Sequence, residues 1–561
     1  MTKNNMRSGG KLLVDQLIVH GATHVFCVPG ESYLAALDAF ADVEDKITLI
    51  TCRHEASAAN MAEAHGKLTG RPGICFVTRG PGACHAAVGL HTAFQDSTPM
   101  ILLIGQIGRD MEDREAFQEM DYRRVFETTT KWTGQIQSAD RIPEMMSHAF
   151  YTAMAGRPGP VALALPEDML VDLSSAMDAR PARQVQPAPR PEDMTELARR
   201  LAGAESPVLL LGGGGWSQEA VANITAFAEN YDLPVACAFR NQDRFDNFHN
   251  NYVGDLGLSP NPAVLDLIGG CDLLLVVGPR LGELTSQGYT LLDIPTPQLP
   301  VIHVHASAEE LGRVYQPDLA INSGMAAFAA AARDLPGLDA PRWKERTAKA
   351  HADYETYIEI QPTKGDLDMA HVLKVLRERL PADAIVSNDA GNFSGWAHRY
   401  WRFSSYPSQL GPTSGAMGYG VPAGMAAAIT EPGRLSVCFV GDGGFLMAGS
   451  ELATAMHHGA KPLIFVINNG IYGTIRMHQE REFPGRKPGT DLTNPDFAAY
   501  ARSFGAFGET VRKDAEFTPA LQRALDSDRA ALIELVTDPD AITTKTTLSE
   551  IRKSALKRQG S

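Results

Sequence analysis

Two short polar corners, each directly after an apolar run, hold the side chains best suited to chemistry. Asp442 follows the run LSVCFV in the stretch GDGG, and Asn469 follows the run PLIFVI in the stretch NNG. In open parallel sheets, ligands bind beyond the carboxyl ends of the strands, so neighbouring strands would bring both corners together. A carboxylate, an amide oxygen and a backbone carbonyl, best supplied by Ile471, are ligands that Mg²⁺ prefers.

The glycines of the first corner predict a second property, which is access to an anion. Gly441, Gly443 and Gly444 leave backbone amides open to a phosphate at the start of the following helical stretch. Ordinary turn chemistry would explain either corner alone, because glycine, aspartate and asparagine are all common in turns. The pairing of the two corners, with a strand before each, favours a magnesium diphosphate site.

The elements that must position these corners follow a simple pattern. Short β-branched runs alternate with helical patterns along nearly the whole chain, as in HVFCV, SYLAALDAF, ITLIT and EASAANMAEAHGKLTG. Such alternation is typical of parallel sheets covered by helices on both faces. The predicted fold class is therefore α/β, with three doubly wound parallel-sheet domains.

Two polar stretches interrupt the alternation and suggest where the domains end. A linker rich in Pro, Arg and Ala lies at 178–193, and a polar connector with helical stretches lies at 335–366. We predict domains at 1–177, 190–335 and 366–540, followed by a tail at 541–561.

Composition excludes several classes of protein. Of the 561 residues, 51 are Lys or Arg and 66 are Asp or Glu, which gives a formal net charge of −15. This balance argues against nucleic acid or an anionic membrane as a partner. The N-terminal stretch lacks the core of a signal peptide, and no apolar run approaches about 20 residues, so we expect a cytoplasmic protein. The seven scattered cysteines are expected to be buried, reduced thiols.

With these motifs, the sequence resembles the thiamine-diphosphate-dependent enzymes over almost the whole chain. The resemblance implies that Asp442, Asn469 and the carbonyl of Ile471 hold Mg²⁺. It also implies a second diphosphate corner in NDAGNFSG (388–395) and an aminopyrimidine-binding segment in SGAMGYGVPAG (414–424). The implied cofactor-binding residues of these two segments are Gly391, Asn392, Phe393, Gly415 and Met417.

The resemblance also assigns the proton chemistry. TCRHEASAANMAEAHGKLTG (51–70) resembles the pyrimidine-binding helix of the family, with Glu55 at its start. A carboxyl group bonded to the pyrimidine ring nitrogen would favour the tautomer that removes the proton from the thiazolium carbon. The competing interpretation is that Glu55 only complements the positive end of its helix.

Further segments resemble the acetolactate synthase branch of the family. They are TRGPGACHAAVGLHTAFQDSTPMILLIGQ (78–106), REAFQEMD (114–121) and AGRPGPVALALPEDM (155–169). This similarity places Pro81 against the cofactor, and Phe117 and Gln118 beside the substrate. The implied reaction is decarboxylation of a 2-oxo acid followed by carboligation to a second carbonyl.

Several residues depart from that branch. Acetolactate synthases usually carry asparagine where this chain has His85 and alanine where it has His91. Glu31 stands where simple 2-oxo acid decarboxylases have an aspartate of their proton relay, whereas Ile475 replaces the relay glutamate. We expect catalytic or substrate-binding roles for His85 and Glu31, although His85 could be structural and Glu31 could cap the following helix.

The middle segment leaves FAD binding open. PVLLLGGGGWSQEA (207–220) suits a nucleotide phosphate, yet tight packing also requires glycines. Of the further FAD-binding segments of acetolactate synthases, only Gly278 and Arg280 match, and His305 replaces the aspartate that would touch the nucleotide. The alternative is a domain of the same fold whose nucleotide site is lost.

The resemblance also implies a homodimer or homotetramer with active sites between subunits. In the family, the residues that correspond to Glu55 and to the diphosphate corner come from different subunits. The favoured function is thiamine-dependent carboligation of 2-oxo acids. The alternatives are a thiamine-dependent lyase, hydrolase or non-oxidative decarboxylase acting on another 2-oxo acid, acyloin or diketone, and a non-catalytic regulatory paralogue. The basic tail could close over the active site or be merely solvated.

Overall fold

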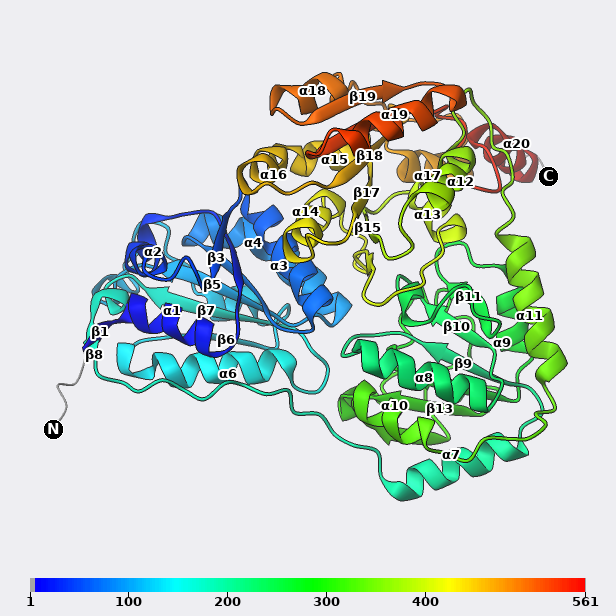
Figure 1. Cartoon of the computed structure of the whole chain (residues 1–561), viewed down its shortest axis with the longest axis horizontal. Coiled ribbons are helices and arrows are strands. Elements are labelled where there is room, and N and C mark those ends of the chain that lie inside the picture. The colour runs from blue at the N-terminus through cyan, green and yellow to red at the C-terminus, as the bar shows by residue number, and fades with distance from the viewer. Residues whose placement is uncertain (1–5, 560–561) are drawn as a thin grey trace. The chain divides into compact units, whose positions relative to one another are not determined.

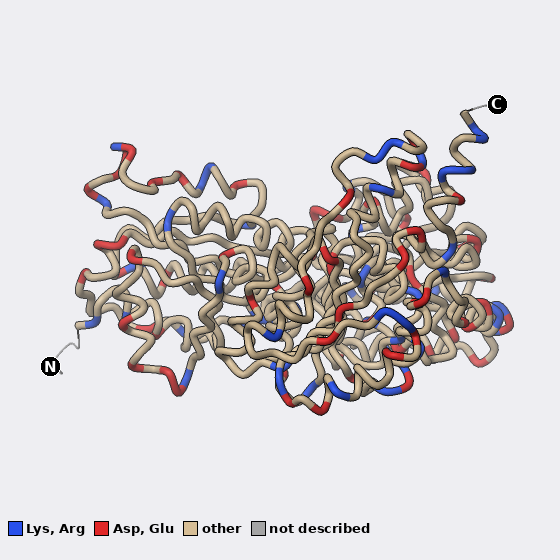
Figure 2. The backbone as a smooth tube through the Cα atoms, turned by 90° about the horizontal axis from the view of Figure 1, so that it is seen from above, with Lys and Arg blue, Asp and Glu red and all other residues tan. Residues whose placement is uncertain are grey.

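The computed structural model describes residues 6–559 and contains three six-stranded sheets, each built of parallel strands (Figure 1). The chain divides into two compact units, of which the first ends at Gln186 and the second begins at Pro187. Figure 2 shows positively and negatively charged residues interspersed along the chain. The predicted α/β class with three parallel sheets is confirmed.

The first unit holds one sheet and a short antiparallel pair, β1 (Arg7–Ser8) with β8 (Leu173–Ser174). In pairing order, the sheet strands are β3 (Thr48–Thr51), β2 (His24–Cys27), β4 (Gly73–Val77), β5 (Met100–Gln106), β7 (Pro160–Pro166) and β6 (Trp132–Gln135). The helices are α1 (Gly9–Val19), α2 (Leu34–Ala41), α3 (Glu55–Thr69), α4 (Gly80–Asp96), α5 (Tyr122–Phe126) and α6 (Ile142–Met154).

Burial explains why these runs form parallel strands. Every residue of β4, β5 and β7 is buried, as expected when helices cover both faces of a sheet. Alternate strand side chains share one core with α1, α2 and α6. The helix α3 lies against β2, β4 and β5 and also packs along α4. This α3–α4 pair carries the polar residues described below.

The second unit holds two sheets. In the first of them the strands pair in the order β11 (Tyr252–Leu256), β10 (Val235–Ala238), β9 (Pro207–Leu211), β12 (Leu273–Val277), β13 (Val301–His305) and β14 (Leu319–Asn322). Its helices are α7 (Pro191–Gly203), α8 (Gln218–Asn230), α9 (Pro262–Gly269) and α10 (Met325–Arg333). The connector helix α11 (Lys344–Tyr357) follows, within the polar stretch where helical character was predicted.

The other sheet of this unit bears the two polar corners. Its strands pair in the order β16 (Gln409–Leu410), β15 (Ile385–Asn388), β17 (Ser436–Gly441), β18 (Leu463–Asn468), β20 (Ala531–Val536) and β19 (Phe507–Val511). The helices are α12 (Met369–Arg379), α13 (Ser394–Tyr400), α14 (Gly420–Thr430), α15 (Asp442–Ala448), α16 (Leu452–His458), α17 (Gly473–Glu482), α18 (Phe497–Ser503), α19 (Asp514–Asp526) and α20 (Leu548–Gln559).

Three further expectations can be compared with the structure. The linker 178–190 is free of helix and strand, and α7 begins at Pro191 within the predicted range. Six cysteines are buried, but Cys84 is exposed on α4, so the expectation of buried thiols is wrong for that residue. Within residues 6–559, no helix is both long and apolar enough to cross a membrane. The domain boundaries remain a prediction.

Candidate active site

One cavity of about 330 Å³ in the second unit gathers the cofactor-binding residues predicted in that unit. Strands β17 and β18 are hydrogen-bonded neighbours, with Gly441 paired to Ile467, so the two corners meet at one sheet edge as expected. The cavity is lined by Gly391, Asn392, Phe393, Gly415, Met417, Gly441, Asp442, Gly443, Gly444, Asn469 and Ile471. Ile475 lines the same cavity.

Asp442 is the first residue of α15 and is 3 % exposed. Its Oδ1 accepts from the amide of Gly443 at 2.9 Å, and its Oδ2 accepts from the amide of Gly470 at 2.9 Å and from Asn494 Nδ2 at 2.7 Å. Burial raises the pKa of Asp442. Among residues 6–559, no Lys, Arg or His side chain pairs with this desolvated carboxylate, so its donors are neutral and the site fits a divalent cation.

Asn494 was not predicted from the sequence, although it organises this site. Its amide group donates to Asp442 and also to Asn468 Oδ1 at 2.9 Å, so it fixes the corner after β18 against the corner after β17. Asn494 lies in a loop without a motif, 52 residues beyond Asp442. The side chain of Asn469, in turn, accepts from the amide of Ile471 at 3.2 Å.

Close packing explains the glycines of the first corner better than turn chemistry does. A Cβ at position 443 would lie 2.5 Å from the Tyr472 ring, and a Cβ at position 444 would lie 2.0 Å from Asp389 Oδ2. A Cβ at 441 would lie 2.9 Å from the ring of Phe393. A side chain at 441 or 443 would displace an aromatic ring that lines the cavity, and one at 444 would displace the buried Asp389.

The second corner is held by α17. The amide of Asn392 donates to Thr474 Oγ1 at 3.1 Å, and the Thr474 hydroxyl donates to Asn392 Oδ1 at 3.0 Å. Thr474 lines the cavity and was not predicted. Gly391 has a φ of +149° and Gly415 a φ of +70°, conformations that favour glycine.

The tail contributes to the same cavity, which favours packing over the site as against the alternative of a merely solvated tail. Ile542 lines the cavity and packs with Ile471 and Leu548 in a small buried cluster. Arg552 lies on α20, and two of its nitrogens donate to the carboxylate of Glu480 on α17. The side chain of Glu480 is fully buried.

In the first unit, Glu55 and His85 are in direct contact. Glu55 begins α3, and its Oε2 lies 2.8 Å from Nδ1 of His85 on α4. The ring of His85 stacks on His54 with a centroid separation of 4.6 Å. The N-cap of α3 is His54, whose Nδ1 accepts from the amide of Ala56 at 3.1 Å.

The ligand atoms of His54, Glu55 and His85 lie within 4.8 Å of one another, close enough to suggest a metal centre. The tautomer of His54 argues against it. A metal-bound histidine donates its other ring N–H to a partner, whereas Nδ1 of His54 accepts a hydrogen bond. The cluster is therefore arranged for hydrogen bonding and proton exchange.

Glu31 does not cap the following helix. Within the described part of the chain, no side chain caps the 3₁₀ turn that begins at Glu31. Oε1 of Glu31 accepts from Arg79 Nη2 at 2.9 Å instead. Arg79 is 7 % exposed, precedes α4 and also lies 3.4 Å from Glu167. Arg79 was not predicted as a site residue, although it lies in the segment 78–106, because an arginine beside a glycine turn does not reveal its distant partner.

The remaining predicted residues of this unit lie near the start of α4. Pro81 occupies the first turn of this helix, and the carbonyl of Gln118 accepts from the amide of Gly80 at 3.2 Å. Gln118 has a φ of +67°, and its neighbour Phe117 is 73 % exposed. The start of α4 thus joins Glu31, Pro81 and Gln118 to the Glu55–His85 pair.

Backbone segments pack closely at the glycine corner of the middle sheet. A Cβ at Gly213 would lie 2.1 Å from the carbonyl oxygen of Gly278, and a Cβ at Gly278 would lie 2.2 Å from the carbonyl oxygen of Gly212. The carbonyl of Gly213 accepts from Arg244 Nη2 at 3.3 Å. Nδ1 of the buried His305 lies 3.0 Å from the backbone nitrogen of Ser307, which donates to it. These contacts explain the glycines by close backbone packing.

Family models match all three sheets. They are described as the N-terminal TPP binding domain (residues 7–125), the central domain (194–332) and the C-terminal TPP binding domain (389–535) of thiamine pyrophosphate enzymes.

Sequence similarity to several known proteins extends over nearly the whole chain. The acetolactate synthase large subunit of Parasynechococcus marenigrum is 31 % identical over 543 residues, which cover 94 % of this chain and 87 % of the relative. The isozyme 2 large subunit of Escherichia coli is 30 % identical over 95 % of this chain and 96 % of its own length. Acetolactate synthase of Bacillus subtilis is 29 % identical over a region that covers 94 % of this chain and 93 % of the relative. The chain therefore belongs to the thiamine pyrophosphate enzyme family and is a thiamine-diphosphate-dependent enzyme similar to the acetolactate synthases.

Proposed function

We propose that this enzyme joins two 2-oxo acids in an acetolactate-synthase-like carboligation. One substrate loses CO₂, its acyl carbon bonds to the carbonyl carbon of the second, and the oxygen of that carbonyl takes up a proton. The observation that carries the proposal is the single cavity lined by eleven of the predicted cofactor-binding residues. Similarity to acetolactate synthases over 94 % of the chain supports the choice of reaction.

When bound, thiamine diphosphate supplies the carbon nucleophile and takes up the electrons released with CO₂. Asp442, Asn469 and the carbonyl of Ile471 would hold Mg²⁺ against the diphosphate, and Asn494 would orient the Asp442 carboxylate. The corner formed by Gly391, Asn392 and Phe393 would bind the other side of the diphosphate. Gly415 would accept from the pyrimidine amine, and Met417 would pack against the cofactor.

The first unit would provide the proton chemistry. Glu55 would share a proton with the pyrimidine ring nitrogen, and His85, at 2.8 Å, would orient its carboxylate and exchange that proton. Glu31, held by Arg79, and Gln118 would face the substrate, while Pro81 would shape the cofactor side of the pocket.

We further propose a homodimer or homotetramer in the cytoplasm. The catalytic glutamate and the cofactor cavity belong to different units of the chain, which is consistent with the family arrangement in which different subunits supply them. None of the seven cysteines, all of which lie in the described part of the chain, forms a disulfide bond, which supports a reducing compartment. The replacement of the aspartate that would touch the nucleotide by His305, whose Nδ1 accepts from the amide of Ser307, supports turnover without FAD.

The experiment offers pyruvate to the purified enzyme with thiamine diphosphate and Mg²⁺, with and without FAD, and follows CO₂ and acetolactate. We expect both products at a rate that FAD does not change. Cofactor binding without CO₂ release would reject pyruvate as donor, and a panel of other 2-oxo acids, acyloins and diketones would then identify the substrate. CO₂ with acetaldehyde but no acetolactate would reject carboligation.

A further inference from the structure

Arg240, in the loop after β10 of the middle sheet, has an unusual conformation for a buried cation. It is 5 % exposed and has a φ of +57°, a left-handed backbone that non-glycine residues rarely adopt. Such strain persists only where surrounding contacts hold the residue in place, and it concentrates at functional sites. The contacts of Arg240 show what holds it.

The guanidinium of Arg240 reaches from the middle sheet to the sheet that bears the cofactor cavity. Nη1 donates to the carbonyl of Pro412, and Nη2 donates to the carbonyl of Asp389 at 3.1 Å. The carbonyl of Pro412 also accepts from the amide of Gly415 at 3.0 Å, which closes the turn before the predicted pyrimidine-binding residue. The carbonyl of Asp389 directly precedes Ala390 and Gly391, which line the cavity.

Asp389 continues this support on its side-chain atoms. Its Oδ2 accepts from the amide of Gly418 at 2.9 Å, and its Oδ1 accepts from the amide of Gly420 at 2.6 Å. The residue bound by Arg240 therefore also holds the segment that carries Gly415. Arg240 itself lines the cavity.

We propose that Arg240 is a positioning residue that sets the two cofactor-binding segments, 389–391 and 412–417, at their working separation. The inference rests on the proposed function, since it assigns those segments to thiamine diphosphate. The middle domain thereby serves the cofactor through this arginine. The planar guanidinium can donate to two carbonyls in fixed directions, which a lysine ammonium on its flexible stem cannot reproduce.

Gly411 makes room for this arginine. A Cβ at position 411 would lie 2.8 Å from Cδ of Arg240 and 3.0 Å from Asn388 Oδ1. Even an alanine there would push the guanidinium away from its carbonyl partners. Gly411 therefore offers a second way to disturb Arg240 without changing its charge.

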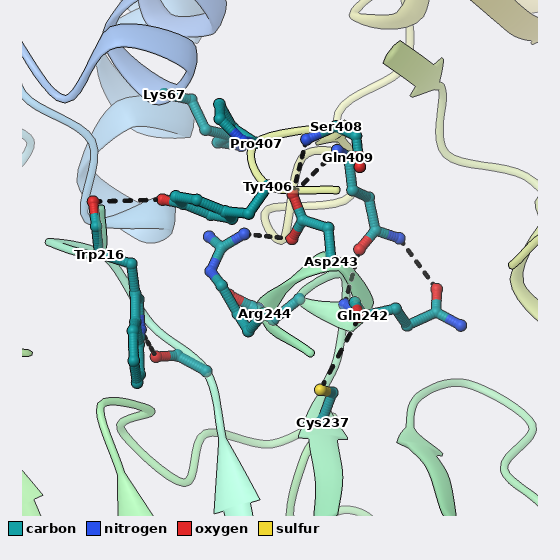
Figure 3. Close-up of polar contacts among 12 residues, drawn as sticks. Lys67, Trp216, Cys237, Gln242, Asp243, Arg244, Tyr406, Pro407, Ser408 and Gln409 are labelled. Atoms are coloured by element: carbon teal, nitrogen blue, oxygen red, sulfur yellow. Dashed lines mark hydrogen bonds and ion pairs between the residues drawn. The ribbon is translucent and has the colours of Figure 1, made fainter. Parts of the chain in front are cut away.

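Arg244, four residues further along the same loop, provides a matched control (Figure 3). It too is buried, pairs with Asp243 and lies 4.8 Å from the centroid of the Tyr406 ring. Asp243 accepts from the amides of Ser408 and Gln409 at 2.9 and 3.0 Å, so this part of the loop also docks on the neighbouring sheet. Arg244, however, is not among the residues that line the cavity.

The test compares Arg240→Lys with Arg244→Lys in the full-length enzyme. Thiamine diphosphate binding in the presence of Mg²⁺ is measured by calorimetric titration, and thermal midpoints are recorded without cofactor. We expect Arg240→Lys to weaken cofactor binding by about 10-fold or more, with kcat at saturating cofactor reduced less. Arg244→Lys should lower the thermal midpoint and leave the dissociation constant within about 2-fold.

Equal cofactor affinity in the two lysine variants would overturn the inference. If Arg240→Lys does not fold, Gly411→Ala decides, with Gly433→Ala as its control because a Cβ at 433 meets no atom within 4 Å. We expect weaker cofactor binding in Gly411→Ala only, and equal binding in both would again overturn the inference. A wild-type enzyme that binds no thiamine diphosphate would instead reject the proposed function.

Discussion

Nδ1 of His85 lies 2.8 Å from Oε2 of Glu55, and this contact joins the first turn of α3 to α4. Gly82 leaves space on the other side, where a Cβ would lie 3.4 Å from Oε1 of Glu55. The carboxylate thus has one oxygen bound by an imidazole and the other beside a residue without a side chain. An imidazole can exchange a proton with this carboxylate, which the asparagine amide expected here in acetolactate synthases cannot.

Replacing Glu55 by glutamine is expected to lower kcat by about 10²–10⁴-fold, because the amide cannot exchange a proton with the cofactor. Thiamine diphosphate binding should change little, since the cavity residues of the second unit stay intact. Turnover is measured by CO₂ release and binding by calorimetric titration. Full activity in Glu55→Gln would restrict Glu55 to its helix. A wild type that binds thiamine diphosphate but releases no product from any 2-oxo acid would instead favour the regulatory paralogue.

A double-mutant cycle tests the link between His85 and Glu55. His85→Ala should lower kcat/KM by about 10-fold in the wild type and have little effect in Glu55→Gln, because the two residues act through one proton. His91→Ala is the control, since His91 is exposed further along the same helix. Additive effects of the two substitutions would mean that His85 acts independently of Glu55.

Metal binding should depend on Asn494 as well as on the predicted ligands. Treatment with EDTA is expected to abolish turnover, and added Mg²⁺ to restore it. Asn494→Ala removes the donor at 2.7 Å from Asp442 Oδ2 and should raise the Mg²⁺ concentration for half-maximal activity about 10–100-fold. An unchanged Mg²⁺ requirement would show that Asp442 is held correctly without Asn494.

His303 predicts acid sensitivity in the middle sheet. It is 3 % exposed, Nε2 lies 2.9 Å from the carbonyl oxygen of Pro279, and burial lowers the pKa of His303 to about 4. The unfolded chain, with a histidine pKa of about 6.5, takes up a proton first as the pH falls. The stabilisation by neutral His303 is therefore complete above about pH 6.5 and is lost between about pH 6.5 and 4, with a loss of about 2 kcal/mol by pH 5.

This effect is measured from the thermal midpoints of wild type and His303→Gln at about pH 7 and pH 5. We expect the difference in thermal midpoint between wild type and His303→Gln to be smaller at pH 5 than at pH 7, because the glutamine side chain cannot take up a proton. His457→Gln, at an exposed position on α16, is the control and should follow the wild type at both pH values. A constant gap for His303→Gln would contradict the prediction.

Arg552→Ala should loosen the tail. The substitution removes the arginine that binds the buried Glu480 carboxylate. Because Arg552 is itself 44 % exposed, we expect the free energy of unfolding to fall by only about 1–2 kcal/mol. Cleavage near α20 by a protease should accelerate, and thiamine diphosphate should dissociate faster because Ile542 lines the cavity. Lys557→Ala, at an exposed position on the same helix, should change neither rate.

The parts of the fold that could be predicted from sequence are those set by local patterns. Buried strands read as continuous apolar runs, and the corners after β17 and β18 stand out because glycine, aspartate and asparagine interrupt such runs. Parallel neighbours then bring Asp442 and Asn469 to one edge without further information.

The site residues that the sequence did not predict have partners that lie far away in the sequence. Asn494 reaches Asp442 across 52 residues, and Arg240 reaches Asp389 across 149. Arg79 meets Glu31 across 48 residues. No periodicity marks such a residue, and a single asparagine or arginine is usually a solvated surface residue.

The walls of the cavity extend along the chain from Phe239 to Ile542. At roughly 5–20 residues per second, a ribosome needs about half a minute to two minutes to add the first 542 residues. During that time the cavity is incomplete, so thiamine diphosphate cannot assist the folding of the emerging domains. Their early folding depends on their own apolar cores, and loading with cofactor is an event of the finished chain.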